Sequence, residues 1–544
     1  MKKTIFFCLA IIVVISIPLK LYTVDFSIPS HTDDFGYIID AVQYNQGDFF
    51  LDQKKHPGWS LFLTPFMSII NSNDFLDYSN LARILTLTIS TITIFPMYVL
   101  ARKFFNEKYS VVAASLFAFE PHLNFISGSA FAEPLLILVL ITSMIFILND
   151  KTKYHYIAFI FAGLCWWVKL EALYPMIAII IIFFVVHRHK PNSLRNFSLC
   201  IVFLLITISP LFIQRDLQFD DPFYVWYGGT IFAEDFTEIM TSPEDAGITN
   251  FVEKHGVLGL MDRLANGLSN LFSVLSRILY PYLFILIPFG VLFSLRPIDQ
   301  KLKNIKANWI MILTLIGVLV IPFTIVDERR FLFPLFPFLI ILSTIPIQRV
   351  TNYGLSAFSF NERQKSVFLV IVVGIVLLLS TTFTMGVGEF GYGLPNSVLE
   401  HEKIEFTEYL VENFDGRILR DETVIDYLNY VSLISGDNVD FKSFKSPRGK
   451  DPYPDLYEPG KVLQLSVNAK TIEELVINGE TKALKYIGIL ENGSHFFPSL
   501  NGLYYNEEKY PYMEKIFDSD EMNYKEFKIK LFEINYQKFH DLNG

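Results

Sequence analysis

Long apolar runs are the feature that most constrains this chain. They include IIVVISIPL, ILVLITSMIFIL, MIAIIIIFFVV and FLVIVVGIVLLL. A helix rises about 1.5 Å per residue, so about 20 apolar residues match the roughly 30 Å hydrocarbon core of a bilayer. Only 18% of the 544 residues are charged, whereas soluble domains carry about 25%. The sequence therefore predicts a polytopic α-helical membrane protein.

About eleven transmembrane helices are predicted. Lys2 and Lys3 precede the first apolar run, but no small-residue cleavage site follows it, so we interpret it as an uncleaved span. The predicted spans are 4–22, 80–101, 109–125, 131–148, 155–170, 172–187, 197–214, 271–295, 308–326, 331–348 and 366–386.

The distribution of lysine and arginine predicts the orientation, because short cytoplasmic loops are enriched in both. With eleven spans, all the basic connections lie on one side: Lys2/Lys3, Arg102/Lys103/Lys108, Lys151/Lys153, Arg188/Lys190/Arg195, Arg296/Lys301/Lys303/Lys306 and Arg349/Arg363/Lys365. We therefore expect a multi-pass protein of the cell (plasma) membrane with a cytoplasmic N-terminus. Loop 23–79, the acidic loop 215–270 and everything after about 387 would lie outside.

Two parts are predicted, a transmembrane domain over 1–390 and a soluble extracytoplasmic α/β domain over 391–544. In the second part EHEKIEFTEYLVENF has the spacing of a helix, and EELVINGETKALKYIGIL suggests a helix followed by a strand. KEFKIKLFEINY alternates with period two, as a half-buried strand does.

Outer loop 23–79 is long enough to contain its own helices. Thr32 and Asp33 could cap a helix through GYIIDAVQYNQG. HPGWSLFLTPFMSII is strongly apolar and is predicted to lie on, or dip into, the outer interface.

Two polar groups in this loop are candidate site residues. Asp33 and Asp34 are either a helix cap and a solvated acid or a carboxylate placed as general base for a hydroxyl nucleophile. Lys55 and His56, in Lys-His-Pro-Gly, form either a surface turn or a binding site for a phosphate or a sugar hydroxyl.

Further candidates lie at the same predicted boundary. Glu133 opens a span at a position where an acid is costly unless it is used. Lys169 and Glu171 do not face each other on one helix, which favours an outer turn between two spans. Arg329 and Arg330 follow two acids, which either neutralise them or leave guanidinium groups for an anionic lipid phosphate.

All these candidate residues are predicted to lie at the same boundary of the bilayer, and this position distinguishes between classes of membrane protein. A secondary transporter tends to place its polar site near the bilayer midplane. Charges gathered at one boundary instead suit a reaction between a lipid-borne group and a molecule arriving from outside.

A nucleic-acid partner is not expected, and a divalent cation is possible but not indicated. The net charge of −10 offers no basic platform for nucleic acid, and the cysteines (Cys8, Cys165 and Cys200) all lie in apolar runs. Asp33, Asp34 and His56 could supply metal ligands, but no spacing requires a metal. No cofactor is predicted to be required.

Several segments resemble the GT-C glycosyltransferases, especially protein O-mannosyltransferases and the aminoarabinose-transferring lipid A enzymes. HTDDFGYIIDA followed by KKHPGWSLF is similar to their first outer loop. Over residues 1–390, further similarities are LARILTLTISTITIFPMYVLARKFF, SGSAFAEPLLIL, GLCWWVKLEAL and ERRFLFPLFPFL. Two departures are Asp-Asp for the usual Asp-Glu pair and Pro-Gly for the usual Pro-Pro.

The resemblance implies inverting transfer of a monosaccharide from a polyprenyl (dolichyl or undecaprenyl) phosphate donor to an acceptor hydroxyl on the outer face. The base would be Asp33, or Asp34 beside it, and the donor phosphate would lie near Arg329, Arg330 and Lys169. The acceptor would be a glycan, a lipid or a protein. Two alternatives remain, a polyprenyl-linked glycan ligase or polymerase, and a non-catalytic transporter or scaffold.

Overall fold

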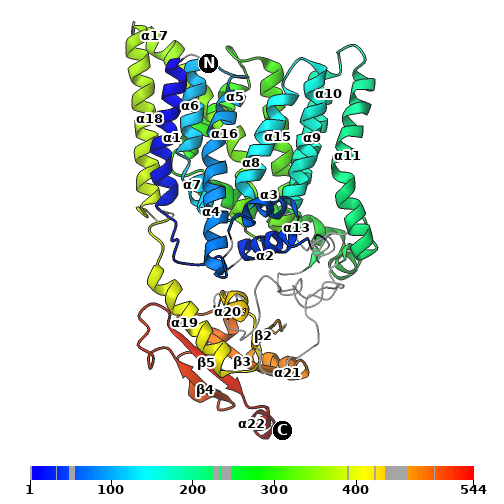
Figure 1. Ribbon diagram of the computed structural model, residues 1–544, viewed down its shortest axis with the longest axis vertical. Coiled ribbons are helices and arrows are strands. Elements are labelled where there is room, and N and C mark those ends of the chain that lie inside the picture. Colours follow the sequence, from blue (N-terminus) through cyan, green and yellow to red (C-terminus); the bar gives the residue numbers. More distant parts are fainter. Residues whose placement is uncertain are drawn as a thin grey trace.

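The computed structural model describes residues 3–31, 33–47, 49, 56–70, 72–223, 232–233, 247–388, 391–421, 424–434, 462–467, 469–494 and 497–543. A bundle of long helices forms one part, and the C-terminal α/β part lies beyond one end of it (Figure 1). The N-terminus lies at the opposite end of the bundle from the C-terminal part (Figure 1).

Helices account for the described part of the bundle. The helices of this part are α1 (Lys3–Leu21), α4 (Phe75–Ile92), α5 (Ile94–Ala101), α6 (Glu107–Ala118), α7 (Pro121–Ser127), α8 (Glu133–Ile147), α9 (Thr152–Val168), η1 (Leu170–Ala172), α10 (Leu173–His187), α11 (Ser193–Phe219), α13 (Ile248–Ile278), α14 (Leu283–Ser294), α15 (Leu302–Leu319), η4 (Pro322–Thr324), η5 (Arg329–Leu335), α16 (Phe336–Arg349), η6 (Val350–Gly354), α17 (Leu355–Ala357) and α18 (Glu362–Thr384).

Each of the eleven predicted spans coincides with a helix or a pair of consecutive helices. Among the described residues, seven helical segments are long and apolar enough to cross a membrane, and a bent pair would make an eighth. The remaining predicted spans correspond to α6–α7, α8 and α9, which are shorter. The protein is a multi-pass helical membrane protein, and the count of eleven stays a prediction.

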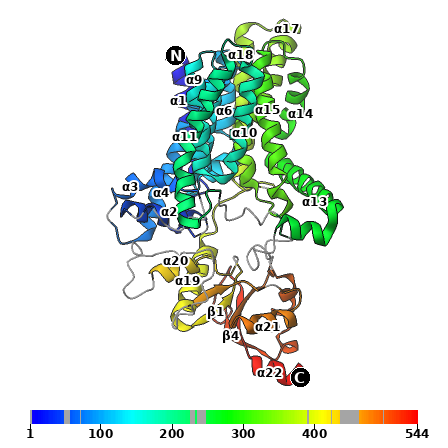
Figure 2. The ribbon, with the colours of Figure 1, turned by 90° about the vertical axis from the view of Figure 1, so that its right-hand side faces the viewer.

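The region around 248–295 differs from the prediction. A single span was expected over 271–295 after a loop over 215–270, but α13 begins at Ile248 and meets α14 at an angle of 114°. Pro281 lies between the two helices and has no amide hydrogen to continue the first one. Seen from the side, α13 lies at the end of the bundle that faces the C-terminal part (Figure 2).

The loop after α1 folds as predicted into two helices, α2 (Asp33–Asn45) and α3 (Gly58–Met67). Helix α2 buries Ile38, Ala41 and Val42, so its apolar face joins the core of the bundle. Helix α3 buries Trp59, whose indole donates a hydrogen bond to the carbonyl of Ala130 at 2.7 Å.

The C-terminal part is an α/β fold, as predicted. Its described strands form one sheet in the order β2-β1-β3-β5-β4, in which β1 runs parallel to β2 and β3, and β5 runs antiparallel to β3 and β4. The strands are β1 (Gly416–Leu419), β2 (Val462–Leu465), β3 (Leu484–Leu490), β4 (Met513–Asp518) and β5 (Ile529–Ile534), and the helices are α19 (Ser397–Asn413), α20 (Leu428–Ile434), α21 (Ile472–Thr481), η8 (Pro498–Gly502), η9 (Glu507–Lys509) and α22 (Tyr536–Asn543).

Alternation along the strands builds a core on each face of this sheet. Leu531 packs with residues of α19 and α20, whereas the next residue, Phe532, packs with residues of α21 and α22. Period two in KEFKIKLFEINY therefore predicted strand β5 correctly, and the helix-then-strand prediction corresponds to α21 and β3.

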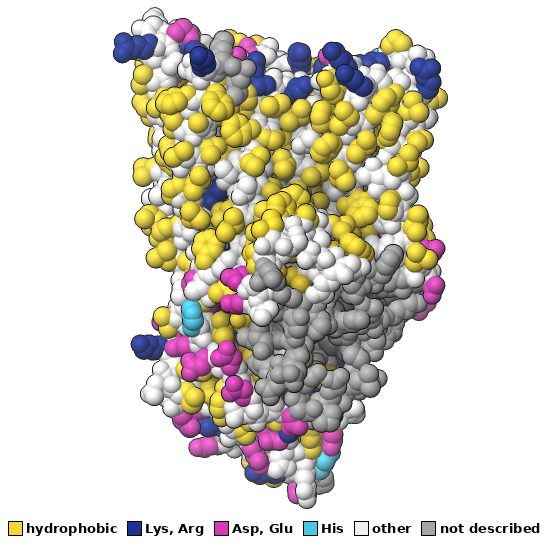
Figure 3. Space-filling model, viewed as in Figure 1, with side chains coloured by type: hydrophobic (Ala, Val, Ile, Leu, Met, Phe, Trp, Pro, Cys, Tyr) yellow, Lys and Arg dark blue, Asp and Glu magenta, His cyan; other side chains and the backbone are white. Residues whose placement is uncertain are grey.

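The surface of the bundle shows an apolar belt. Hydrophobic side chains cover its middle, lysine and arginine line the end far from the C-terminal part, and acidic side chains lie below the belt (Figure 3). This separation agrees with the predicted orientation, which stays a prediction.

Candidate functional site

The candidate site lies where α2, α8, the α9–α10 turn and η5 meet, at the end of the bundle near the C-terminal part. Asp33 is the first residue of α2, and its Oδ2 accepts a hydrogen bond from the Arg330 guanidinium at 3.2 Å. The two residues are 297 positions apart in the chain. The tertiary structure therefore joins two of the candidate residues directly.

Arg330 has two further partners. Its Nε lies 3.2 Å from Oε1 of Glu328, and its guanidinium carbon lies 4.4 Å from the centre of the Phe131 ring. Glu328 also accepts from the Arg330 amide and so caps η5. Arg330 is thus paired with two carboxylates: Glu328, two positions away in the sequence, and Asp33, 297 positions away.

Arg329 points to a different group. Its guanidinium lies 5.8 Å from the centre of the Tyr392 ring, and Tyr392 lies 2.6 Å from Nδ1 of His122. The Tyr392 ring also stacks on Phe125 at 4.0 Å. Of the two arginines that the sequence singled out, only Arg330 joins the carboxylate cluster.

Lys169 and Glu133 form the second ion pair of the site. Lys169 Nζ donates to Oε1 of Glu133 at 2.7 Å, and Glu133 is almost completely buried. Glu171 lies 3.8 Å from the same ammonium. This contact is compatible with their spacing because Lys169 is extended at the end of α9 and Glu171 belongs to η1, so the predicted turn is confirmed.

Tyr37 lies among these charges, and the sequence analysis did not assign it to the site. Burial raises the pKa of its phenol well above the usual value, and the carboxylates of Asp33 and Glu133 raise it further. The phenol therefore stays protonated. The signal for Tyr37 was its position one turn after Asp33 on α2, because residues four apart share a helix face.

Asp34 differs from its neighbour in exposure. The side chain of Asp33 is 48% exposed, whereas Asp34 is buried. The Asp34 carboxylate attracts the guanidinium of Arg83 electrostatically. Arg83 in turn donates to the backbone carbonyls of Asp25 and Ile28, at 2.9 and 2.6 Å. The Asp34 carboxylate thus interacts electrostatically with Arg83, which holds the backbone preceding α2, whereas the Asp33 carboxylate is half exposed.

His56 is buried against the end of α9, and Lys55 lies outside the described residues. Burial and then the nearby Arg215 lower the pKa of His56 to about 3, so the imidazole is neutral. Its Nδ1 lies 2.5 Å from the carbonyl of Trp166 and therefore carries the proton. Its Nε2, buried as well, is left as an acceptor with no hydrogen-bond partner among the described residues.

The position of Gly58 explains why glycine follows Pro57 here, where the family that the sequence resembles usually has a second proline. A Cβ at this position would lie 2.6 Å from the carbonyl carbon of Trp167. Any side chain would therefore push α3 away from α9, whereas glycine allows the two backbones to approach.

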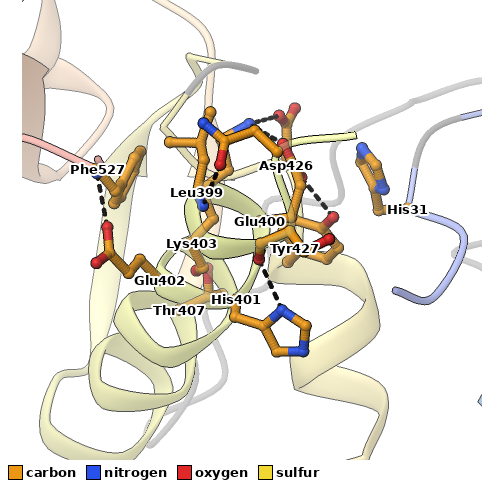
Figure 4. A network of polar contacts seen from close by, with 12 residues as sticks. His31, Leu399, Glu400, His401, Glu402, Lys403, Thr407, Asp426, Tyr427 and Phe527 are labelled. Carbon is orange, nitrogen blue, oxygen red and sulfur yellow. Dashed lines mark hydrogen bonds and ion pairs between the residues drawn. The ribbon is translucent and has the colours of Figure 1, made fainter. Parts of the chain in front are cut away.

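The C-terminal part contacts the segment that leads into α2 (Figure 4). The His31 ring lies 4.3 Å from the ring of Tyr427, centre to centre. Tyr427 donates to Glu400 at 2.6 Å, and Lys403 pairs with Glu400 at 3.1 Å and with Asp426 at 3.3 Å. This network reaches to within two residues of Asp33.

The site as a whole combines four carboxylates with two cations. The carboxylates are Asp33, Glu133, Glu171 and Glu328, and the cations are Lys169 and Arg330. Among the described residues, no group of three or more His, Cys, Asp or Glu side chains is arranged to hold a metal ion. The arrangement therefore supplies a partly exposed carboxylate beside two cations that are able to bind an anion.

Similarity to known proteins extends over part of the sequence and over most of the fold. The family model of dolichyl-phosphate-mannose-protein mannosyltransferases matches residues 54–213. No curated protein matches the chain in sequence. The apo oligosaccharyltransferase of Archaeoglobus fulgidus is similar in structure, with a TM-score of 0.57 and 13% identity over 90% of this chain and 70% of that one.

Two lipid-phosphate complexes are also similar in structure. The oligosaccharyltransferase AglB from Archaeoglobus fulgidus, in complex with an inhibitory peptide and a dolichol-phosphate, has a TM-score of 0.56 and 14% identity over 90% of this chain and 69% of that one. ArnT from Cupriavidus metallidurans, bound to undecaprenyl phosphate, has a TM-score of 0.52 and 13% identity over 96% of this chain and 97% of that one. The predicted resemblance to GT-C glycosyltransferases is confirmed by the family match over residues 54–213 and by the similarity of the fold.

Proposed function

We propose that this chain, a membrane glycosyltransferase with the GT-C fold, transfers a monosaccharide from a polyprenyl phosphate to an acceptor hydroxyl, with inversion. The observation that carries the proposal is the ion pair between Asp33 and Arg330 at 3.2 Å. It places a candidate base and a candidate phosphate-binding cation next to each other at one end of the bundle.

The donor phosphate would bind to Arg330 and Lys169. Guanidinium and ammonium groups both form short, charge-assisted hydrogen bonds to phosphate oxygens. Both cations are paired with carboxylates in the described structure, so the phosphate competes with Asp33 and Glu133 for them. The prenyl tail would extend between the helices of the bundle.

Binding of the donor would also prepare the base. A carboxylate next to a cation is a weaker base, because the opposite charge stabilises its ionised form. When the phosphate takes over Arg330, Asp33 loses part of that stabilisation and becomes a better proton acceptor. Its 48% exposed side chain is open to an acceptor hydroxyl, whereas Asp34 is buried, so we assign the base to Asp33.

The transfer step then follows from these positions. Asp33 accepts the hydroxyl proton as the oxygen attacks the anomeric carbon, and the prenyl-phosphate leaves from the opposite face. Arg330 and Lys169 stabilise the negative charge that develops on the leaving phosphate. The Tyr37 phenol, which is buried and protonated near the carboxylates of Asp33 and Glu133, would donate a hydrogen bond within the site.

Neither a nucleotide nor a metal takes part in this proposal. A lipid-phosphate donor carries its own leaving group, and the two cations supply the compensating charge. We therefore expect purified protein to keep its activity in the presence of EDTA, measured as product formed per minute. Loss of activity that Mg²⁺ or Mn²⁺ restores would contradict this point and leave the assignment of Asp33 to be tested separately.

The site would face outward. On the surface of the bundle, lysine and arginine side chains gather at the end opposite the site (Figure 3). Short loops rich in lysine and arginine are retained in the cytoplasm, so the site would lie on the outer side. Cysteines introduced near Asp33 and near Asn492 should react with a membrane-impermeant reagent in intact cells, whereas cysteines near Lys151 and Lys303 should not. Labelling of both sets would contradict this orientation.

Transfer of a preassembled glycan is the second candidate. The similarity to the archaeal oligosaccharyltransferase favours it, whereas the match to a family that is named for the transfer of mannose favours a single sugar. Mass spectrometry of lipid-linked sugars and surface glycans in a strain lacking this chain separates the two. Loss of one sugar residue supports the proposal, and loss of a whole glycan supports the alternative.

The same strain identifies the sugar and the acceptor. The name of the matched family makes mannose the first sugar to test, with dolichyl and undecaprenyl phosphates as carriers. Restoration by the wild-type chain, but not by Asp33→Asn, would link the glycan change to the site. Unchanged glycans and lipid-linked sugars in the deletion strain would refute the proposed activity.

A further inference from the structure

A polar cavity lies at the end of the bundle opposite the Asp33 site. It has a volume of about 460 Å³ and is formed where α5, α8, α15 and α16 end or begin. Small-molecule sites typically enclose roughly 300–1,000 Å³. The charged lining residues are Arg102, Lys103, Lys301, Lys303, Asp150 and Asp299, so four cations face two acids.

The two acids already have partners. Asp150 lies 2.6 Å from Nζ of Lys303 and 3.8 Å from Nζ of Lys190. Asp299 accepts a hydrogen bond from the Tyr353 hydroxyl at 2.9 Å. In the part of the chain that the structure describes, neither Lys103 nor Lys301 forms an ion pair. Positive charge in the lining therefore exceeds what its own acids neutralise.

The crowding of these cations is also visible at Lys103. Burial lowers the pKa of Lys103, and the neighbouring charges of Lys301 and Lys303 lower it further, against the opposing effect of Asp150. The side-chain amide of Asn304 donates to the Lys103 carbonyl at 2.6 Å and joins the start of α15 to the end of α5. The lysines are thus held near one another by the fold.

The N-terminus of a helix adds to the positive electrostatic potential in the cavity. Helix α15 has 18 residues and begins at Leu302, between the lining residues Lys301 and Lys303, and its N-cap residue, Lys301, makes no side-chain capping hydrogen bond. The first amide groups of a helix and its macrodipole favour a bound anion. Two lysines without an ion pair among the described residues, an arginine and a helix N-terminus therefore converge on one cavity.

We propose that this cavity binds the phosphate group of a ligand, either the head group of an anionic phospholipid or a soluble phosphomonoester. Both sources present the same chemistry, a compact anion that accepts hydrogen bonds from ammonium, guanidinium and amide groups. The cavity lies at the lysine- and arginine-rich end of the bundle, where anionic lipid head groups bind in the proposed orientation (Figure 3). It is separate from the donor site, since that site lies at the other end.

The test measures binding to the purified full-length protein by native mass spectrometry and by the shift of its thermal unfolding midpoint. The probes are short-chain phosphatidic acid, glycerol 3-phosphate and short-chain phosphatidylcholine. We expect one or both of the first two to bind and phosphatidylcholine to bind much more weakly. Binding of phosphatidic acid alone identifies a lipid head group, and equal binding of glycerol 3-phosphate identifies a soluble phosphomonoester.

Variants locate the site. Lys103→Gln/Lys301→Gln should weaken binding by roughly tenfold or more, a change of about 1.4 kcal/mol or more. Asp299→Asn removes a negative charge from the lining and should tighten binding several-fold. The matched control is Lys108→Gln, because Lys108 lies at the same end but pairs with Glu362 at 3.0 Å outside the cavity.

Three outcomes would overturn the proposal: no binding of either phosphate probe, wild-type affinity in the double variant, or an equal loss in Lys108→Gln. Because the readout is binding and not sugar transfer, the proposed glycosyltransferase reaction is not affected by the result. Gel filtration of each variant shows whether it is folded, and Asp299→Asn tests the same site by a gain rather than a loss.

Discussion

The two ends of the transmembrane bundle use charge in different ways. At the end near the C-terminal part, Arg330 and Lys169 are paired with carboxylates that come from other helices, Asp33 and Glu133. At the opposite end, Lys103 and Lys301 border a cavity, and neither forms an ion pair with a described residue. Arg330 and Lys169 are thus held in ion pairs at one end, whereas Lys103 and Lys301 border the cavity at the other end without an ion pair to a described residue.

This difference has a consequence for binding. In the proposed mechanism, an anion at the first end displaces a carboxylate, which is then released beside it, so that anion binding and the preparation of the base are coupled. An anion at the second end displaces no internal partner of Lys103 or Lys301. The first arrangement suits a reaction, and the second suits simple binding.

The largest expected effect comes from Asp33→Asn. This substitution keeps the shape of the side chain and removes its basicity, and general-base catalysis is typically worth about 10²–10⁴-fold. We expect kcat to fall by that factor while donor binding persists, measured with purified protein and a polyprenyl-phosphate sugar. Asp77→Asn, at an exposed position in the first turn of α4, is the control and should be neutral.

Asp34→Asn separates the two acids. Because Asp34 is buried and acts on Arg83, we expect a smaller loss of kcat together with a lowered thermal midpoint. If Asp33→Asn retains near-normal turnover and Asp34→Asn does not, the assignment of the base is wrong although the site is right. Normal turnover in both would contradict the general-base mechanism.

The next effect concerns the arginines. Lysine lacks the planar fork of arginine, so Arg330→Lys cannot hold Glu328 and a phosphate in the same way. We expect the donor KM to rise about tenfold, which corresponds to roughly 1.4 kcal/mol. Arg329→Lys should change it less, because Arg329 faces Tyr392. An equal rise in donor KM in both variants would show that pairing with a carboxylate does not make Arg330 more important than Arg329 for donor binding.

A moderate effect on stability is expected from Gly58→Ala. The new Cβ would lie 2.6 Å from the Trp167 backbone, and such overpacking costs about 1–3 kcal/mol. The control is Gly317→Ala in α15, where a Cβ meets no atom within 4 Å. Thermal unfolding of both variants in detergent measures the difference. Equal midpoints would show that α3 shifts freely relative to α9.

The smallest effect is expected from Tyr427→Phe. It removes the hydrogen bond to Glu400 but keeps the ring beside His31. A hydrogen bond to a charged group contributes about 1.5–3 kcal/mol, but Glu400 keeps its ion pair with Lys403 at 3.1 Å, so we expect a loss at or below the lower end of this range. A slightly lower thermal midpoint is expected. Tyr505→Phe, which removes an exposed bond to Glu491, is the control and should have less effect. A large loss of kcat in Tyr427→Phe would show that the C-terminal part acts directly on the site.

The elements were largely predictable because each follows from a local pattern. Apolar runs predicted the spans, period two predicted β5, and the Lys169–Glu171 spacing predicted a turn that the structure confirms. The bend between α13 and α14 was not predicted, because the apolar run over 271–295 continues across Pro281. Helix α13 also begins earlier than the predicted loop allowed.

The sequence by itself determined the membrane class of this protein, the order of its helices and the set of residue types at the candidate site. Only the tertiary structure decided which of those residues meet: Arg330 rather than Arg329 reaches Asp33, and Tyr37 lies among the charges. Helix and strand patterns are local, so neighbouring residues reveal them. An ion pair across 297 positions depends on how whole helices pack, and no local pattern carries that information.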